Sequence, residues 1–543
     1  MQQLLKRLKE ILSANLSGKL CLLIAIIAKI AVQIEAFGFG GDKSYQLVAA
    51  KNLLAGNGIT IGQVSLSDLS TISYQPLVGW PPGYTIAVAP LLWLFNGDYQ
   101  LAALSFDLLC LIPFFYFLLR LSDFLITEKW LRNLFILFTG LFIYPATSKL
   151  GTDLFSFSCM MGAFYYLLQL MEKPGRRYVF LTALTLFLAG LFRYNYIPVA
   201  MAIPVLLLIA AFVNKKKEWK ISAFYLGAIL IGLFSLLLLF QYYYTGAATY
   251  IRKTETGFYG DHLLDVHPIV LSSLADIETW LGFFSRATGT DYISNRTIIS
   301  DISFILFLLL LLYSMAWLVR KKLKLADRSD NFISAGTGIS LSIIAVLAYL
   351  AASNAMLHWA SGEEWTYLLE HRYFVFVCFF IQLIVFARLF AKYKILNRFW
   401  KGIAISCAFL MILNSVHKGL YIAKLSVSES KKIIAGDPVG NDADLIMSMY
   451  KKIKRSYPDH EIIVASPKKV ICNYAALENI KSSNELRPFH MKNLVSSKPT
   501  KILLVLEGTY SKSFLPALAQ PGVEYLQQQG EWYFYLLNVA QAN

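Results

Sequence analysis

Charged residues are scarce in this chain. Only 15% of its 543 residues are Asp, Glu, Lys or Arg, whereas soluble proteins carry about 25%. Hydrophobic residues make up 57% of the chain, and the mean hydropathy is +0.53. This balance excludes an ordinary soluble domain and predicts a polytopic membrane protein.

Cysteine is also rare, and its positions exclude two classes of site. The six cysteines are Cys21, Cys110, Cys159, Cys378, Cys407 and Cys472. The first five lie in apolar runs, where cysteine behaves as a small hydrophobic residue. Cys472 is alone in a polar tail, so no disulfide can form there, and no spacing typical of metal ligands is present. An internal repeat is not visible either, which argues against a transporter built from inverted repeats.

The net charge of +16 is distributed by side of the membrane. Eleven apolar stretches have the length of about 17–22 residues that a membrane crossing needs. They lie near 20–37, 101–120, 133–148, 154–171, 178–192, 196–213, 221–241, 302–319, 332–352, 373–391 and 401–420. The loops on the N-terminal side collect 24 Lys and Arg, and the longer loops on the other side hold nine. The positive-inside rule therefore predicts a cytoplasmic N-terminus, an exported C-terminal part and no nucleic-acid partner.

The expected organisation is an α-helical polytopic membrane domain over 1–425 and a small C-terminal domain over 426–543. No small-residue cleavage site follows Leu20–Phe37, so this run is expected to be a retained span of a multi-pass protein in the plasma (bacterial inner) membrane. Three long loops, 38–100, 242–301 and 352–372, fall on the outer face. Long loops often carry function, so the outer face is the expected working face.

The tail alternates strand-like and helical patterns. The expected strands are Glu461–Ala465, Lys501–Leu506, Val523–Leu526 and Trp532–Asn538. Helical patterns lie between them at Ala443–Ile453, Lys468–Leu477 and Ser511–Leu518. This order predicts a small α/β domain outside the cytoplasm, periplasmic or extracellular, without a recognisable catalytic or nucleotide motif.

Asp42 follows the first span at the outer boundary of the membrane. A carboxylate there meets the requirements of a general base that takes a proton from a hydroxyl or amine. The structural alternative is a helix N-cap, because Asp42 precedes a short amphipathic stretch, Tyr45–Leu54, expected to lie on the surface. The two roles are compatible.

Asp153 and Arg193 are further charged residues at outer span ends. Asp153 is a candidate second acid of the same cavity, or simply an acid at the start of a helix. Arg193 lies between two apolar runs, where an arginine is costly unless it pairs with an anion or reaches the interface. For each of the two residues, a role in the site and a purely structural role both stay open.

His371 and Arg372 begin the tenth span on the outer side. A guanidinium at that place suits bidentate binding of phosphate oxygens. The aromatic residues around it are typical of the membrane interface, which accounts for them but less well for Arg372. Arg252 could add to an anion site or be a solvated loop charge.

Lys29 and Asp107 are charges inside expected spans. Their depths below the outer surface roughly match, so they are predicted to form a buried structural pair. Each alone would cost about 3 kcal/mol at the membrane centre.

Several short motifs resemble the GT-C superfamily of integral-membrane glycosyltransferases. The closest likeness is to its protein-mannosyltransferase and aminoarabinose-transferase-like bacterial branch. The motifs are Gly41–Tyr45, Ala49–Gly58, Trp80–Tyr84, Thr152–Phe155, Gly190–Tyr194 and His371–Tyr373. They are scattered over residues 1–391, and their order and sidedness carry the resemblance.

The resemblance implies a GT-C-like enzyme that transfers a sugar from a polyprenyl-phosphate-linked donor, with inversion, to a lipid, glycan or protein acceptor. Asp42 would be the general base, Asp153 a second catalytic acid, and Arg372, His371 and Arg193 the ligands of the lipid phosphate. Tyr45, Tyr84, Glu364 and Arg252 are further candidates for substrate binding. Many relatives have a second acid after the first, but Lys43 stands there in this chain. This departure argues against a metal held by an acidic pair. A divalent metal stays open but is not indicated, so no metal ligand and no cofactor are assigned.

Two other classes of function stay as alternatives. A polysaccharide transporter or polymerase would have broken spans at matching positions and charges through both leaflets, and neither pattern is seen. An assembly scaffold would need its tail and tolerate changes of Asp42 and Arg372.

Overall fold

The computed structural model describes residues 15–35, 41–141, 151–213, 215–245, 375–390, 398–427, 439–486 and 488–541, with a few positions between 285 and 309. It divides the chain into two compact units. Unit 1 comprises residues 1–33 and 107–424, and unit 2 comprises residues 34–106 and 425–543. Each unit is described by itself.

Unit 1 is helical. Its helices are α2 (Asn15–Glu35), α6 (Leu111–Leu125), α7 (Lys129–Leu141), α9 (Gly151–Glu172), α10 (Arg176–Phe192), α11 (Tyr196–Val213), α12 (Lys217–Thr245), α17 (Val375–Ile384) with the π-helical η5 (Val385–Phe390), and α18 (Arg398–Val427). Within the described residues, three helical stretches are long and apolar enough to cross a membrane, namely Tyr99–Leu125, Thr152–Glu172 and Lys217–Thr245. These helices indicate that the chain is an integral membrane protein.

The helices follow the expected spans with one clear difference. The span expected at 101–120 is made of two helices, α5 (Tyr99–Leu109) and α6, which meet at Cys110. The spans expected near 302–319 and 332–352 lie almost wholly outside the described residues. The total of eleven spans therefore stays a prediction.

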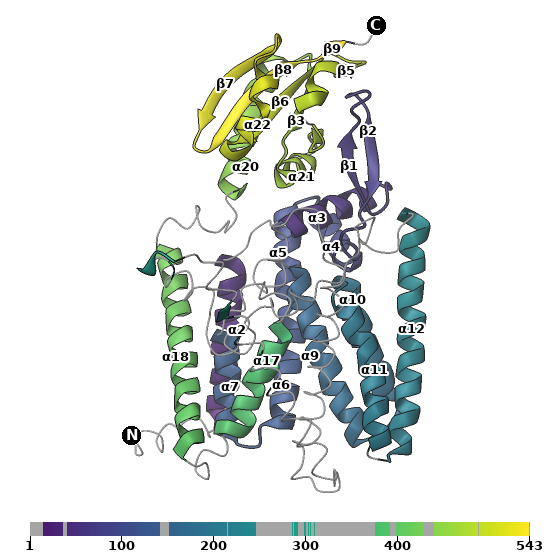
Figure 1. Ribbon diagram of the computed structural model, residues 1–543, viewed down its shortest axis with the longest axis vertical. Coiled ribbons are helices and arrows are strands. Elements are labelled where there is room, and N and C mark those ends of the chain that lie inside the picture. The colour runs from purple at the N-terminus through teal and green to yellow at the C-terminus, as the bar shows by residue number, and fades with distance from the viewer. Residues whose placement is uncertain are drawn as a thin grey trace. The chain divides into compact units, whose positions relative to one another are not determined.

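Small residues let the helices of unit 1 approach closely. Figure 1 shows α9, α10, α11 and α12 running side by side. Gly140 of α7 lies against Ala25 of α2, so that a Cβ on Gly140 would come within 2.5 Å of the Ala25 Cα. Because glycine has no side chain, the backbones of two helices can come into contact there, as is typical of helices in membranes.

Unit 2 contains a five-stranded sheet built by the C-terminal part of the chain. Its strands are β3 (Glu461–Ala465), β4 (Ser482–Ser483), β6 (Thr500–Glu507), β7 (Val523–Gln529) and β8 (Trp532–Asn538), in the order β4-β3-β6-β8-β7. β3 is parallel to β4 and β6, and β8 is antiparallel to β6 and β7. The short strands β5 (Val495–Ser496) and β9 (Ala540–Gln541) form a separate parallel pair. The four strands expected in the tail are confirmed.

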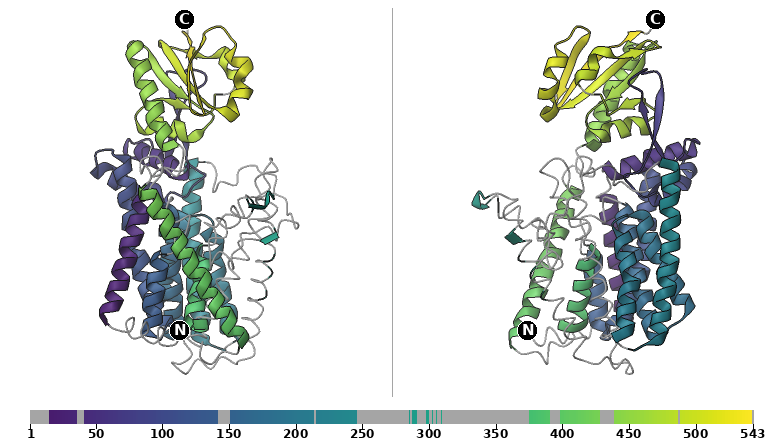
Figure 2. Two further views of the ribbon diagram at one scale, coloured as in Figure 1. Left: turned by 90° about the vertical axis from the view of Figure 1, so that its left-hand side faces the viewer. Right: turned by 45° about the vertical axis from the view of Figure 1, so that its right-hand side comes forward.

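The two faces of this sheet carry different helices, because side chains alternate along each strand. Leu503 and Val505 face α20 (Val439–Ser456) and α21 (Lys469–Leu477). Leu504 and Leu506 face α22 (Gly508–Leu518) and the 3₁₀ turn η7 (Pro488–Asn493). Figure 2 shows α20 and α22 on opposite faces of the sheet.

The first long loop belongs to the same unit as the tail. It contains α3 (Gly41–Leu54), the antiparallel hairpin of β1 (Thr60–Val64) and β2 (Ile72–Pro76), α4 (Gly83–Leu94) and the start of α5. Val64 and Leu69 of the hairpin are buried in the core beneath α22. The compact units therefore differ from the expected linear division at residues 425 and 426, because the first loop and the tail share one core.

Candidate functional site

Asp42 lies in the first turn of α3 and is partly exposed. The helix begins at Gly41, so Asp42 is inside the helix, and the interpretation as an N-cap is wrong. A carboxylate in a first turn is stabilised by the positive end of the helix dipole. The side-chain amide of Gln46 donates to the backbone oxygen of Asp42 at 3.0 Å.

The rest of α3 corrects the expectation of a surface helix. Residues 43–50 are all buried, because α4 and α21 pack against this helix. The amphipathic pattern of Tyr45–Leu54 indicated a surface helix, but its polar residues, such as Lys51 and Asn52, are bonded inside the unit. Asp42 therefore stands, partly exposed, at the start of a helix whose next eight residues are buried.

The two tyrosines proposed for substrate binding are buried. Tyr45 stacks on Trp80, with ring centroids 4.7 Å apart and an interplanar angle of 22°. Tyr84 is 0% exposed and meets Phe106 edge to face, with centroids 5.2 Å apart. Both rings support the packing around α3 and α4, and substrate binding by either one stays a prediction.

Asp153 and Arg193 form a buried ion pair in unit 1. Asp153 is in the first turn of α9, and Arg193 directly follows α10. The Arg193 Nε donates to the Asp153 Oδ1, and the residues are only 4% and 8% exposed. The N-terminus of α9 favours the carboxylate and the C-terminus of α10 favours the guanidinium, so both helix dipoles stabilise the pair.

The next residues along the chain extend this polar group. The hydroxyl of Tyr194 accepts a hydrogen bond from the side chain of Gln241, at the end of α12. Sequence reasoning missed this bond. Its signal was a glutamine at the end of the long apolar run 221–241, where a polar residue needs a partner.

The predicted site residues fall into three groups. His371, Arg372, Glu364 and Arg252 lie outside the described residues. Asp42 belongs to unit 2, whereas Asp153 and Arg193 belong to unit 1. The structure thus brings Asp153 and Arg193 together, and the convergence of the other residues on one chamber stays a prediction.

Lys29 and Asp107 are both buried in unit 1, as expected for charges inside spans. The Lys29 Nζ lies 5.8 Å from the centroid of the Phe114 ring. A cation above an aromatic face is attracted by the ring quadrupole. The ion pair between Lys29 and Asp107 stays a prediction.

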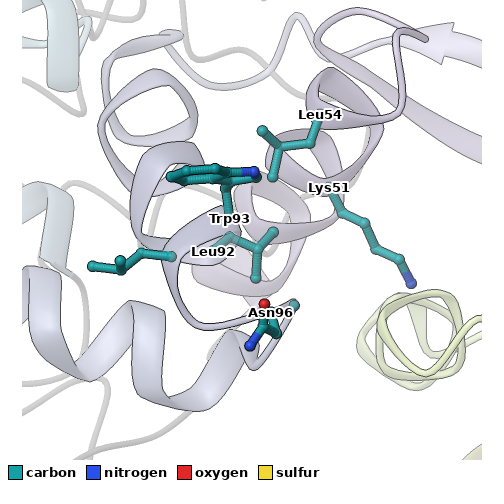
Figure 3. Close-up of a pocket in the computed structure, with 7 residues that line it drawn as sticks. Lys51, Leu54, Leu92, Trp93 and Asn96 are labelled. Carbon is teal, nitrogen blue, oxygen red and sulfur yellow. The ribbon is translucent and has the colours of Figure 1, made fainter.

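Unit 2 has a cavity of about 430 Å³ beside α3 and α4. Its lining residues are Lys51, Leu54, Leu92, Trp93, Leu94, Asn96 and Gly97. Figure 3 shows the Lys51 side chain running away from the Trp93 ring toward α21. Its Nζ donates to the backbone oxygens of Ala476 at 2.6 Å and Leu477 at 2.8 Å.

Lys51 is therefore held by protein groups. Burial lowers the pKa of Lys51 to about 8, and the nearby Glu478 carboxylate opposes this shift. An ammonium already bonded to two carbonyls is a poor starting point for a phosphate site. The cavity is mainly apolar, and we assign it no substrate.

Comparisons with known proteins found similarity to solved structures. No protein-family model matches the chain, and no curated protein matches it. The structure is similar to that of ArnT from Cupriavidus metallidurans bound to undecaprenyl phosphate, at 12% sequence identity and a TM-score of 0.48. It is also similar to ArnT from Cupriavidus metallidurans in the apo state, at 12% identity and a TM-score of 0.42. Both alignments cover 95% of this chain and 97% of the other.

Proposed function

We propose that this protein is an inverting glycosyltransferase that uses a polyprenyl-phosphate-linked sugar at the outer face of the membrane. The acceptor is a lipid, a glycan or a protein that offers a hydroxyl or amine. Asp42 acts as the general base. The observation that carries the proposal is the position of Asp42, a partly exposed carboxylate at the start of a helix whose next eight residues are buried.

The environment of Asp42 fits the work of a base. A base must be held within hydrogen-bond reach of the proton that it removes, at about 3 Å. Residues 43–50 fix the helix by burial, while Asp42 itself keeps access to solvent. An ionised carboxylate is a hydrogen-bond acceptor only, as a base must be.

The reaction transfers one proton and exchanges one bond. Asp42 accepts the proton of the acceptor hydroxyl or amine as its oxygen or nitrogen attacks the anomeric carbon of the donor sugar. The bond between this carbon and the phosphate oxygen breaks on the opposite side, which inverts the configuration. Polyprenyl phosphate leaves with the bonding electrons.

Cationic side chains stabilise the leaving phosphate in this proposal. Arg372 and His371 are assigned to it by the resemblance, and Arg193 is a third candidate. Positive groups that are already in place stabilise the charge that develops on a leaving group. A guanidinium presents five N–H donors, and one of those of Arg193 bonds Asp153. Asp153 would then orient Arg193 and lower the cost of burying it.

The test replaces Asp42 by Asn in the purified full chain. Undecaprenyl phosphate, which the ArnT structure contains, is a carrier of the proposed class. Undecaprenyl-phosphate hexose, pentose and aminopentose are offered as donors with a membrane lipid and glycan extract, and release of undecaprenyl phosphate is measured. We expect wild type to consume at least one donor and Asp42→Asn to lose at least about 100-fold in rate, within the range that general-base catalysis contributes.

Asp98→Asn is the matched control. Asp98 lies in the same loop, and its Oδ1 accepts the backbone N–H of Leu101 at the start of α5. Asparagine can make the same bond, so this variant should keep wild-type activity. Full activity of Asp42→Asn, or no turnover of any donor by wild type, contradicts the proposed function.

A further inference from the structure

Helix α21 of the C-terminal part packs directly against α3, the helix that begins with Asp42. The Asn473 Nδ2 donates to the Ser44 Oγ at 3.0 Å. Ser44 is 0% exposed and Asn473 is 3% exposed, so the bond is shielded from water. If either side chain is removed, the other is left buried without a hydrogen-bond partner and out of reach of water. Breaking this bond is therefore costly, so it holds the two helices together.

A second anchor lies two turns further along α3. The Lys51 Nζ donates to the backbone oxygens of Ala476 and Leu477, which are among the last carbonyls of α21. The Ala476 oxygen also accepts the backbone N–H of Asn479 at 3.2 Å. The ammonium adds to this cap and meets the negative end of the helix dipole. Figure 3 shows the Lys51 amine directed at this helix.

The two anchors lie on one face of α3. Ser44 and Lys51 are seven residues apart, which corresponds to about two helical turns. Tyr45 and Ala49 lie on a different face, in a cluster with Leu77. The helix is thus held on one side by α21 and on another by the loop itself.

The residue next to α21 strengthens the same contact. The Tyr99 hydroxyl donates to the Glu478 carboxylate at 2.8 Å, and the Tyr99 ring meets Tyr474 of α21 edge to face. Tyr99 begins α5. α21 therefore touches both the helix that carries Asp42 and the start of a candidate membrane span.

From this geometry we infer that α21 positions Asp42, with Asn473 and Lys51 as positioning residues that act through α3. The inference rests on the proposed function, because it assigns to the C-terminal part a role in placing the general base. Asn473 bonds Ser44, two residues from Asp42, in the first turn of the same helix. A displacement of about 1 Å in a reacting group can lower a rate about 100-fold, so a loosened first turn should be visible in kcat.

The test compares two contacts that both join the tail to the first loop. Asn473→Ala removes the bond to α3. Ser497→Ala removes side-chain bonds to Asp68 and Ser70 in the loop between β1 and β2, and it does not touch α3. Any general loosening of unit 2 should appear in both variants.

The first readout is hydrogen–deuterium exchange of the full chain. We expect Asn473→Ala to raise exchange of the amides of residues 42–54, and Ser497→Ala to leave these amides as in wild type. This measurement needs no substrate. Equal protection of α3 in the two variants overturns the inference.

The second readout is kinetic and uses whichever undecaprenyl-phosphate sugar the wild type consumes. We expect Asn473→Ala to lower kcat about tenfold and to leave KM for the donor within about twofold, as for an interaction that matters only in the transition state. Ser497→Ala should keep kcat. A purely structural role of Asn473 would lower the amount of folded enzyme at unchanged KM, so kcat is calculated per folded molecule. A value per folded molecule equal to that of wild type overturns the inference.

Ser44→Ala provides a variant with an unchanged tail, so a folding failure of Asn473→Ala does not end the test. If Asn473 acts through Ser44, then Ser44→Ala, Asn473→Ala and the double variant should lower kcat by the same factor. Multiplying effects overturn the inference. Wild-type kcat in Asn473→Ala, with Asp42→Asn inactive, overturns the inference alone, whereas full activity of Asp42→Asn overturns the proposed function as well.

Discussion

Arg193 depends on a carboxylate partner in the protein interior. It is buried at the end of α10 and bonded to Asp153. We expect Arg193→Met to destabilise the protein by about 3–5 kcal/mol, because the change leaves the Asp153 carboxylate buried without its cation. Thermal and denaturant unfolding of the full chain in detergent would measure the loss.

The double variant Asp153→Asn with Arg193→Met is the control for this pair. It removes both charges, so we expect it to be more stable than Arg193→Met alone. The double variant could instead lose as much stability as Asp153→Asn and Arg193→Met lose together. That result would show that Arg193 stabilises the protein through contacts other than its pair with Asp153.

The sequence predicted the need for a partner of Arg193 and could not choose it. A buried arginine requires an anion, and both a lipid phosphate and a side chain meet that requirement. Asp153 stands 40 residues away and was itself a candidate, but only packing of α9 against α10 places the two together. Ser44 and Asn473 are harder still, since 429 residues separate them and neither stands out in its segment.

At the scale of helices, the approach of α2 and α7 depends on Gly140. A Cβ there would meet the Cβ and the Cα of Ala25. We therefore expect Gly140→Ala to push the two helices apart and to destabilise the protein by about 1–3 kcal/mol, as overpacking does. Unfolding of the full chain in detergent is the measurement.

Gly402 of α18 is the matched control for this change. A Cβ at Gly402 would meet nothing within 4 Å. Alanine is the better helix former, so Gly402→Ala should be neutral or slightly stabilising. Equal losses in the two variants would contradict the close approach of α2 and α7.

The Asp68 carboxylate is one of the groups that join the loop between β1 and β2 to the tail. Asp68 accepts hydrogen bonds from the backbone N–H and the hydroxyl of both Ser70 and Ser497. These bonds, first those from the two backbone N–H groups, lower the pKa of Asp68 to about 2 from its usual 3.8. A lowered pKa in the folded state means that the unfolded chain binds the proton more readily, so stability falls as the pH falls.

The pH window of this contribution follows from those values. We expect the stability difference between wild type and Asp68→Asn to be constant above about pH 4 and to shrink as the pH falls to about 2. Thermal unfolding of both proteins from pH 2 to 6 tests this. A difference that is the same at pH 2 and pH 6 would contradict the role of the charged carboxylate.

Local patterns predicted the elements of the tail better than those of the loop. β3 and β6 are continuous runs of Ile, Leu and Val, because one face of each strand meets α20 and the other meets α22. α3 gave no such signal, because its polar residues are buried against another segment. Its burial comes from contacts that lie far along the chain, so the sequence pattern alone indicated a surface helix.

At the scale of the whole molecule, unit 2 is assembled from two segments that more than 300 residues separate. Hydropathy divides a membrane chain into spans and loops, and it cannot show that one loop shares a core with a distant tail. Val64 and Leu69 are short apolar interruptions in a polar loop, and their partners, such as Leu504 and Phe514, lie in the tail. Loop and tail should therefore unfold together.

Cys472 reports this joint unfolding, because it is the unit's cysteine and is buried. Burial raises its pKa to about 12, so the thiol is unreactive while unit 2 is closed. Leu69→Ala removes a buried side chain of the first loop and should cost about 2–5 kcal/mol. If loop and tail form one cooperative unit, a loss of 2 kcal/mol raises labelling of Cys472 by a maleimide about 30-fold, as peptide mapping by mass spectrometry would measure. Ile72→Ala changes an exposed residue of the same hairpin and should leave the labelling rate unchanged, whereas an unchanged rate in Leu69→Ala would mean that the tail folds without the loop.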